Sequence, residues 1–328
     1  MRTLIPALWC IAGLATASAW AQPLPPSEAG VTMGHWHLNS GDVDANRKIF
    51  LALGGTAFKL GTFEIVKFPG VYVYLNMPQG APPSAGGNDG AVVNEVGVAV
   101  QNVEETTARL KASGVPVQPG INGRRDQAFV TLPDGLSIEI LEDKSQKVPI
   151  QHRTVQFAVT ESSIPEIQAW YAKVFSAKPM TRDQNRAAEI PGASLTFVKA
   201  DRPTVTTKGR ALDHIGFDVK NLEAFLNNLQ ANGIKLDRPY TKTPFVALAF
   251  IYDPWGTYIE LNERPSYSIA PVRVVRTLTP RTYHPCCCFV VVHDPSLPSR
   301  TDFAVTHNTD LTEMLWWYAV PWFEEGTA

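Results

Sequence analysis

An internal repeat constrains the fold of this 328-residue chain more than any other feature. Residues 94–119 (NEVGVAVQNVEETTARLKASGVPVQP) and 213–239 (DHIGFDVKNLEAFLNNLQANGIKLDRP) share one pattern. Each has an alternating apolar strand, a polar turn, an amphipathic helix, a glycine and a new strand. The glycines, Gly114 and Gly233, stand where helices commonly end in the left-handed conformation. We therefore predict the same supersecondary unit at both places.

Each copy then closes with a glycine-marked turn into a strand, PDGLSIEILED in the first and DPWGTYIELNE in the second. A weaker pair precedes these copies, because residues 34–75 and 152–200 again read as strand, helix and hairpin strands. The sequence thus predicts an α+β fold of four βαβββ modules, paired into two curved-sheet barrels. We expect neighbouring modules to pair, with a first pair over 33–144 and a second over 150–264.

The two ends of the chain do not follow the repeat. Residues 1–21 contain one arginine, an apolar stretch and a small-x-small site before Gln22, which is typical of a cleaved secretory signal. We predict a secreted or periplasmic protein with no membrane segment after cleavage. Residues 265–328 match no module, and we predict an irregular, disordered tail.

Charge and composition narrow the classes of partner. The net charge is −2 and no Lys/Arg-rich run is present, which argues against nucleic acid because binding its backbone needs clustered positive charge. Hydrophobic residues make up 45% and charged residues 18%, a globular composition. We therefore expect a small-molecule substrate.

A histidine and a glutamate take comparable strand positions in the second copy. In LDHIGFDV, His214 and Gly216 share one strand face, and in GTYIELNE, Glu260 shares a face with Tyr258. On the inner face of a curved sheet, His214 and Glu260 would meet in one cavity. Imidazole and carboxylate groups bind Zn, Fe, Mn and Ni, so the pair predicts a divalent-metal site. A structural histidine and a surface carboxylate are the alternative.

The modules, with DHIGFDV and DPWGTYIEL, resemble the vicinal oxygen chelate superfamily over residues 33–264. That family includes glyoxalase I, bleomycin-resistance proteins and extradiol dioxygenases. The resemblance implies metal ligands on the first and last strands of paired modules. It places His214 and Glu260 in the second pair, and it places three candidates in the first pair: His35, Glu95 and Glu139.

The third module departs from the ligand pattern. Its first-strand position is Thr154, and threonine is a poor ligand for these metals. His152 and Gln156 share that strand face, so one of them is expected to complete the site of His214 and Glu260. In the first module, His37 shares a face with His35.

The resemblance implies a metal-dependent enzyme whose substrate chelates Fe, Mn, Zn or Ni through adjacent oxygens. Four modules in one chain are similar to extradiol dioxygenases, which also carry an acid–base histidine and tyrosine on the closing hairpin. Here the tyrosine position is Phe250, and YTKTPFVALAF contains no histidine. One alternative is a glyoxalase-like lyase or isomerase with Glu260 as a catalytic group, although glutathione is cytosolic and the signal predicts export. The others are a metal-free binding protein of the bleomycin-resistance type and, for the assembly, a homodimer.

Overall fold

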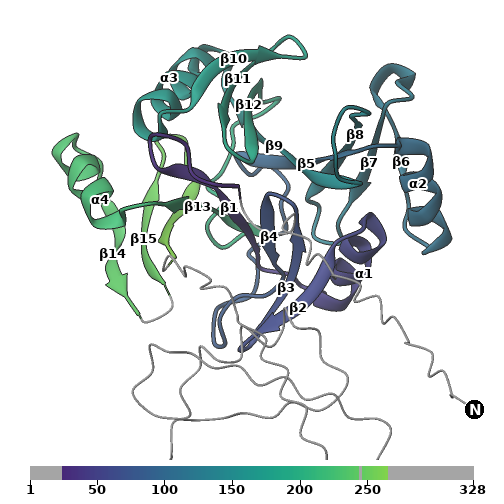
Figure 1. Cartoon of the computed structure of the whole chain (residues 1–328), viewed down its shortest axis with the longest axis horizontal. Helices are drawn as coiled ribbons and strands as arrows, with labels where there is room; N and C mark the ends of the chain where they lie inside the picture. Colours follow the sequence, from purple (N-terminus) through teal and green to yellow (C-terminus); the bar gives the residue numbers. More distant parts are fainter. Residues whose placement is uncertain (1–23, 244–245, 265–328) are drawn as a thin grey trace, which may run out of the picture. The chain divides into compact units, whose positions relative to one another are not determined.

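The computed structural model describes residues 24–243 and 246–264, so the predicted leader (1–21) and tail (265–328) lie outside the described residues. Within this part, the order of one strand, one helix and three strands occurs four times (Figure 1). This order confirms the α+β class and the βαβββ modules. All four modules lie in one unit, Ser18–Arg264.

The elements of the modules are as follows. Module 1 contains β1 (Val31–Leu38), α1 (Val43–Leu53), β2 (Thr56–Leu60), β3 (Phe63–Phe68) and β4 (Val71–Tyr74). Module 2 contains β5 (Val93–Val100), α2 (Val103–Ala112), β6 (Gln118–Pro119), β7 (Gln127–Thr131) and β8 (Ser137–Glu142). Module 3 contains β9 (Ile150–Val159), α3 (Ile164–Phe175), β10 (Lys178–Arg182), β11 (Asn185–Ile190) and β12 (Ala193–Lys199). Module 4 contains β13 (Leu212–Val219), α4 (Leu222–Ala231), β14 (Leu236–Lys242), β15 (Ala247–Tyr252) and β16 (Tyr258–Glu263).

Local sequence explains where three of the helices begin and two of them end. The side chains of Asp42, Asn102 and Asn221 accept hydrogen bonds from the backbone N–H three residues later, which caps α1, α2 and α4. Gly114 and Gly233 follow α2 and α4 with φ of +74° and +79°. Both glycines therefore adopt the left-handed conformation that the repeat predicted. No helix among the described residues has the length and apolarity needed to span a membrane.

The strands form two eight-stranded sheets. The first runs β14-β15-β16-β13-β1-β4-β3-β2, and the second runs β10-β11-β12-β9-β5-β8-β7-β6. Module 1 thus shares a sheet with module 4 through antiparallel β1 and β13, and module 2 shares a sheet with module 3 through β5 and β9 (Figure 1). Our pairing of neighbours, 33–144 and 150–264, is therefore wrong. Among the described strands, neither sheet closes into a barrel.

Connection lengths account for this pairing. Only seven residues, 143–149, join β8 to β9, which keeps modules 2 and 3 in one sheet. The connections 75–92 and 200–211 are longer and cross from one sheet to the other. They are also bonded to each other, because the N–H of Val92 donates to the carbonyl of Val205 at 2.9 Å. The two crossovers therefore support each other.

The first strand of each module, β1, β5, β9 or β13, contains one residue that has no partner on the neighbouring first strand. These residues are Gly34 in β1, Asn94 in β5, Arg153 in β9 and Asp213 in β13. A bulge of this kind breaks the two-residue alternation of side chains and re-aims a side chain beside it. Each bulge comes directly before the first-strand position that the family resemblance marks in its module, which is His35, Glu95, Thr154 or His214.

Strand β1 is buried on both faces, which places polar side chains inside the protein. Trp36 faces the hydrophobic core, where its ring lies 6.5 Å from that of Phe50. His35 and His37 point to the opposite face and are only 3% and 6% exposed. A buried polar side chain is costly unless it is hydrogen-bonded or binds a ligand. This face of the first sheet is therefore the place to look for a site.

Candidate metal centre

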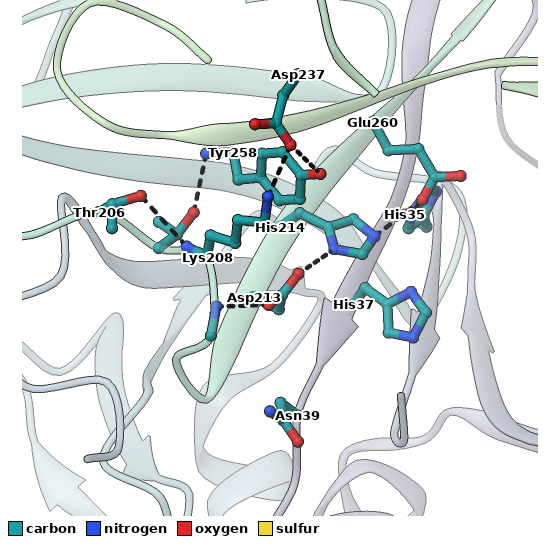
Figure 2. Close-up of polar contacts among 12 residues, drawn as sticks. His35, His37, Asn39, Thr206, Lys208, Asp213, His214, Asp237, Tyr258 and Glu260 are labelled. Carbon is teal, nitrogen blue, oxygen red and sulfur yellow. Dashed lines mark hydrogen bonds and ion pairs between the residues drawn. The ribbon is translucent and has the colours of Figure 1, made fainter. Parts of the chain in front are cut away.

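Four side chains meet on the first sheet. His35 and His37 come from β1, His214 from the neighbouring strand β13, and Glu260 from β16 beside it (Figure 2). Their ligand atoms all lie within 4.8 Å of one another, and the four residues are at most 9% exposed. We call these residues the His/Glu cluster.

The two partners of Glu260 come from different modules. One oxygen of Glu260, Oε2, lies 2.9 Å from Nε2 of His214 and 3.2 Å from Nε2 of His35. The strand register makes this convergence possible, because Gly216 lies opposite both His35 and Glu260. With no side chain at position 216, the ring of His35 reaches across β13 toward the carboxylate.

The outer nitrogen of two cluster rings is held by the protein. His214 places Nδ1 2.6 Å from Oδ1 of Asp213. His37 donates from Nε2 to the backbone carbonyl of Asn76 at 2.9 Å. Because a carbonyl only accepts, Nδ1 of His37 is the nitrogen with a free lone pair. The inner nitrogens of these rings are thus left for the cluster.

The charges in the cluster follow from burial and these contacts. Burial would raise the pKa of Glu260, but the hydrogen bonds from His214 and His35 hold it well below its ordinary value. Burial would lower the pKa of His214, but Asp213 and Glu260 raise it to about 9. Burial lowers the pKa of His35, and it also lowers that of His37 to about 3. Without a cation, one imidazolium therefore lies between two carboxylates, and two neutral imidazoles lie beside it.

The donor set fits a divalent transition metal. Neutral imidazole nitrogens and a carboxylate oxygen are the groups that Zn, Fe and Ni bind, and two histidines with one carboxylate are typical of Fe(II) oxygenases. Loss of the single extra proton of His214 would leave a carboxylate and three neutral imidazoles around one point. The buried positive charge of a cation would then replace that of the imidazolium.

Aromatic rings surround the cluster. Tyr74 stacks on His37 at a centroid distance of 4.9 Å, while Phe250 and Tyr258 lie 5.3 and 6.0 Å from His214. Lys208 lies 4.4 Å above the ring of Tyr258 (Figure 2). These apolar ring faces limit the access of water and give a planar substrate a surface to stack on.

His152 does not complete this site. It lies on β9 in the other sheet, where its ring is 5.0 Å from Trp36 and Nδ1 donates to the carbonyl of Gly192 at 2.6 Å. Burial lowers its pKa to about 4, so it is a neutral core residue. The bulge at Arg153 turns it away from the face of Thr154, and module 3 does not pair with module 4. The partner of His214 and Glu260 that we expected from His152 or Gln156 is instead His35.

Glu95 and Glu139 lie on neighbouring strands of the second sheet. Glu95 accepts a hydrogen bond from Ser137 at 3.0 Å, and Glu139 accepts one from Gln127 at 2.5 Å. Burial and the charge of Glu139 raise the pKa of Glu95 to about 7. Thr154 faces the same side, because it and Glu139 both lie opposite Gly97.

His35 lies in the first sheet, whereas Glu95 and Glu139 lie in the second. The three residues that we predicted as one ligand set are therefore not together. Within residues 24–243 and 246–264, the His/Glu cluster is the one group of three or more His, Cys, Asp or Glu side chains whose ligand atoms converge.

Tyr74 takes a position at the site that the repeat explains. It lies opposite His37 as Glu260 lies opposite Gly216, so it takes in module 1 the place that Glu260 takes in module 4. Asp213 was missed because strict alternation assigns it to the face opposite His214, and only the bulge brings the two together.

Comparisons with known proteins agree with this fold. Residues 153–261 match the family model described as the Glyoxalase/Bleomycin resistance protein/Dioxygenase superfamily. A sequence comparison with curated proteins found no match. Glyoxalase I from Zea mays superposes with a TM-score of 0.55 and 18% identity, over 71% of this chain and 92% of that chain. A Bacillus subtilis protein with a provisional dioxygenase assignment gives a TM-score of 0.53 and 14% identity, over 71% of this chain and 85% of that chain.

Proposed function

We propose that this chain, whose residues 153–261 match the model of the Glyoxalase/Bleomycin resistance protein/Dioxygenase superfamily, is a divalent-metal-dependent enzyme with its site on the sheet of modules 1 and 4. One observation carries the proposal, the convergence of His35, His37, His214 and Glu260. Its substrate is a small molecule with two adjacent oxygens, the class that the family resemblance implies.

The reaction that the site supports best is an oxygenation. The shortest contacts join Glu260 to two histidines, His35 and His214, and this set of two imidazoles and one carboxylate suits Fe(II). When bound there, the cation supplies Lewis-acid polarisation of the substrate oxygens and redox capacity. The predicted export signal supports this choice over chemistry that depends on cytosolic glutathione.

The protein's own groups have separate tasks in this proposal. Glu260, His35 and His214 hold the cation. His37 presents a neutral imidazole to the cluster, because its Nε2 donates to the carbonyl of Asn76 and its Nδ1 keeps a lone pair. In this proposal it takes the part of the acid–base histidine that the closing hairpin lacks, with Nδ1 facing the substrate hydroxyl. Phe250 and Tyr258 exclude water from one side.

A second candidate rests on His37 as well. If its Nδ1 is a fourth ligand, all four side chains of the His/Glu cluster would hold the cation, which would serve to bind the substrate oxygens and not dioxygen. The enzyme would then be a lyase or isomerase that uses the cation only as a Lewis acid.

The variant His37→Gln separates the two candidates. For the oxygenase, we expect the full chain loaded with Fe(II) to keep its iron but to lose about 10²–10⁴-fold of its oxygen uptake with a simple catechol, the usual contribution of an acid–base group. His152→Gln, a buried histidine of the second sheet, is the matched control and should change neither quantity. Loss of iron in His37→Gln, with no oxygen uptake by the wild-type chain, would favour the lyase or isomerase. A wild-type chain that binds no divalent cation would contradict both.

A further inference from the structure

Asp213 makes two close contacts at the cluster without belonging to it. Its Oδ1 lies 2.6 Å from Nδ1 of His214, and its Oδ2 accepts the backbone N–H of Gly209 at 2.6 Å (Figure 2). The residue is only 4% exposed. A nitrogen donor faces each of its two oxygens, so Asp213 accepts at both of them as a carboxylate does.

The bulge in β13 creates this contact. His37 pairs with His214 and Leu38 pairs with Leu212, so Asp213 has no partner on β1. In a regular strand the side chains of residues 213 and 214 would point to opposite faces. The extra residue turns Asp213 toward the ring of its own neighbour.

The contact is particular to module 4. None of the bulge residues of the other three modules offers a carboxylate: Gly34, Asn94 and Arg153. Among the described residues, no acidic side chain lies at Nδ1 of His35, where the amide nitrogen of Asn262 lies at 3.5 Å. Of the two histidines that reach Glu260, His214 is thus the one whose outer nitrogen is held by a charge.

The connection between modules 3 and 4 fixes Asp213 in turn. Gly209 belongs to that connection, and its neighbour Lys208 donates to Asp237 at 2.7 Å. Because the loop is held on the sheet at Lys208, the N–H of Gly209 reaches Asp213 from a fixed direction. The carboxylate therefore has one orientation in which both oxygens are satisfied.

We propose that Asp213 is a positioning residue, which holds the proton of His214 on Nδ1 and so reserves the Nε2 lone pair for the cation. This role rests on the proposed function, since it requires that His214 binds a metal. A carboxylate that accepts the second ring N–H of a metal-binding histidine fixes the tautomer and the ring orientation.

Asparagine cannot replace both contacts. It has one accepting oxygen and one donating NH2 group, whereas His214 and Gly209 both present donors. If the oxygen stays with Gly209, the NH2 group faces Nδ1 and favours the tautomer with the proton on Nε2. If the amide is reversed, the NH2 group faces the N–H of Gly209. The substitution Asp213→Asn therefore tests the role with almost no change in volume.

The test is the Kd of the full-length chain for Zn²⁺, measured by competition with a chromophoric chelator. Asp213→Asn should weaken binding by about 10–100-fold, the usual cost of losing an outer-shell partner of a ligand. Asp253→Asn is the matched control, because Asp253 is a buried aspartate of the same module, 3% exposed, that accepts from Tyr171 at 2.9 Å and contacts no cluster histidine in the described part of the chain. Its Kd should equal that of the wild type. Equal Kd values for Asp213→Asn and the wild type would overturn the positioning role and leave the proposed function intact.

A second measurement uses the wild-type chain alone, so it does not depend on whether a variant folds. In the metal-free protein, proton NMR should show a strongly downfield Nδ1–H resonance, which isotope labelling of histidine assigns to His214. Its absence would overturn the inference. A wild-type chain that shows this resonance but binds no Zn²⁺, Fe²⁺, Mn²⁺ or Ni²⁺ would overturn the proposed function and, with it, the role toward a cation.

Discussion

The variant Glu260→Gln is expected to lose the divalent cation. Removal of an outer-shell partner of a ligand usually weakens metal binding by about 10–100-fold. The loss of affinity in Glu260→Gln should be larger, because Glu260 is itself the proposed ligand. It is the carboxylate that contacts His35 at 3.2 Å and His214 at 2.9 Å. Glutamine keeps the volume but removes the charge and replaces one oxygen with an NH2 group that cannot bind a metal. The measurement is the Kd for Zn²⁺ of the full chain.

Glu139→Gln is the matched control for this substitution. Glu139 lies opposite Gly97 in the second sheet as Glu260 lies opposite Gly216 in the first. It also accepts a hydrogen bond, from Gln127, but no histidine is among the residues that it contacts in the described part of the chain. We expect its Kd to match that of the wild type. Loss of the cation in Glu139→Gln, with retention in Glu260→Gln, would place the site on the other sheet.

Gly216→Ala should have a comparably large effect, although it removes no ligand. A Cβ atom at position 216 would lie 1.9 Å from Cε1 and 2.1 Å from Nδ1 of His35. The ring of His35 is 3% exposed and lies 5.2 Å from Tyr74 and 5.5 Å from His214, so it cannot shift without leaving Glu260. We expect loss of cation binding and a fall of about 1–3 kcal/mol in the free energy of unfolding, typical of overpacking. Zn²⁺ competition and chemical denaturation measure the two effects.

Gly97→Ala distinguishes loss of a ligand from general strain. It would crowd Thr154 in the second sheet, whose Oγ1 lies 2.0 Å from the position of the new Cβ. We expect this variant to be destabilised by a similar amount but to bind Zn²⁺ as the wild type does. If Gly216→Ala also kept its affinity, His35 would not be a ligand.

Local features of the fold were predictable from the sequence because each of them depends on one short segment of the chain. Gly114 and Gly233 mark helix ends with a backbone conformation that glycine adopts most readily. His214 and Glu260 lie on adjacent parallel strands of one module, so periodicity and the repeat were enough to bring them together. Within a module, sequence distance is short and each face is set by alternation.

The pairing of modules could not be read from the sequence in this way. All four modules begin with apolar strands of similar pattern. The residues of β1 are therefore compatible with pairing to β5 as well as to β13. The choice depends on the reach of the connections and on contacts between them, such as that of Val92 with Val205. This is why the partner of His214 was sought at His152 instead of His35.

Bulges were the second feature that alternation could not predict. One extra residue in β13 brings Asp213 to the side of His214, and one in β9 turns His152 into the core. Both outcomes depend on strand register, which is a property of two strands together and is not encoded in either one alone.

The most direct test of the site is the X-ray absorption spectrum of the full chain loaded with one equivalent of Zn²⁺. A cation held by His35, His214 and Glu260 would show the multiple-scattering pattern of at least two imidazole rings together with oxygen ligands. A shell of oxygen ligands with no imidazole would contradict the account, because it would place the cation at carboxylates such as Glu95 and Glu139 instead of on the sheet that modules 1 and 4 share.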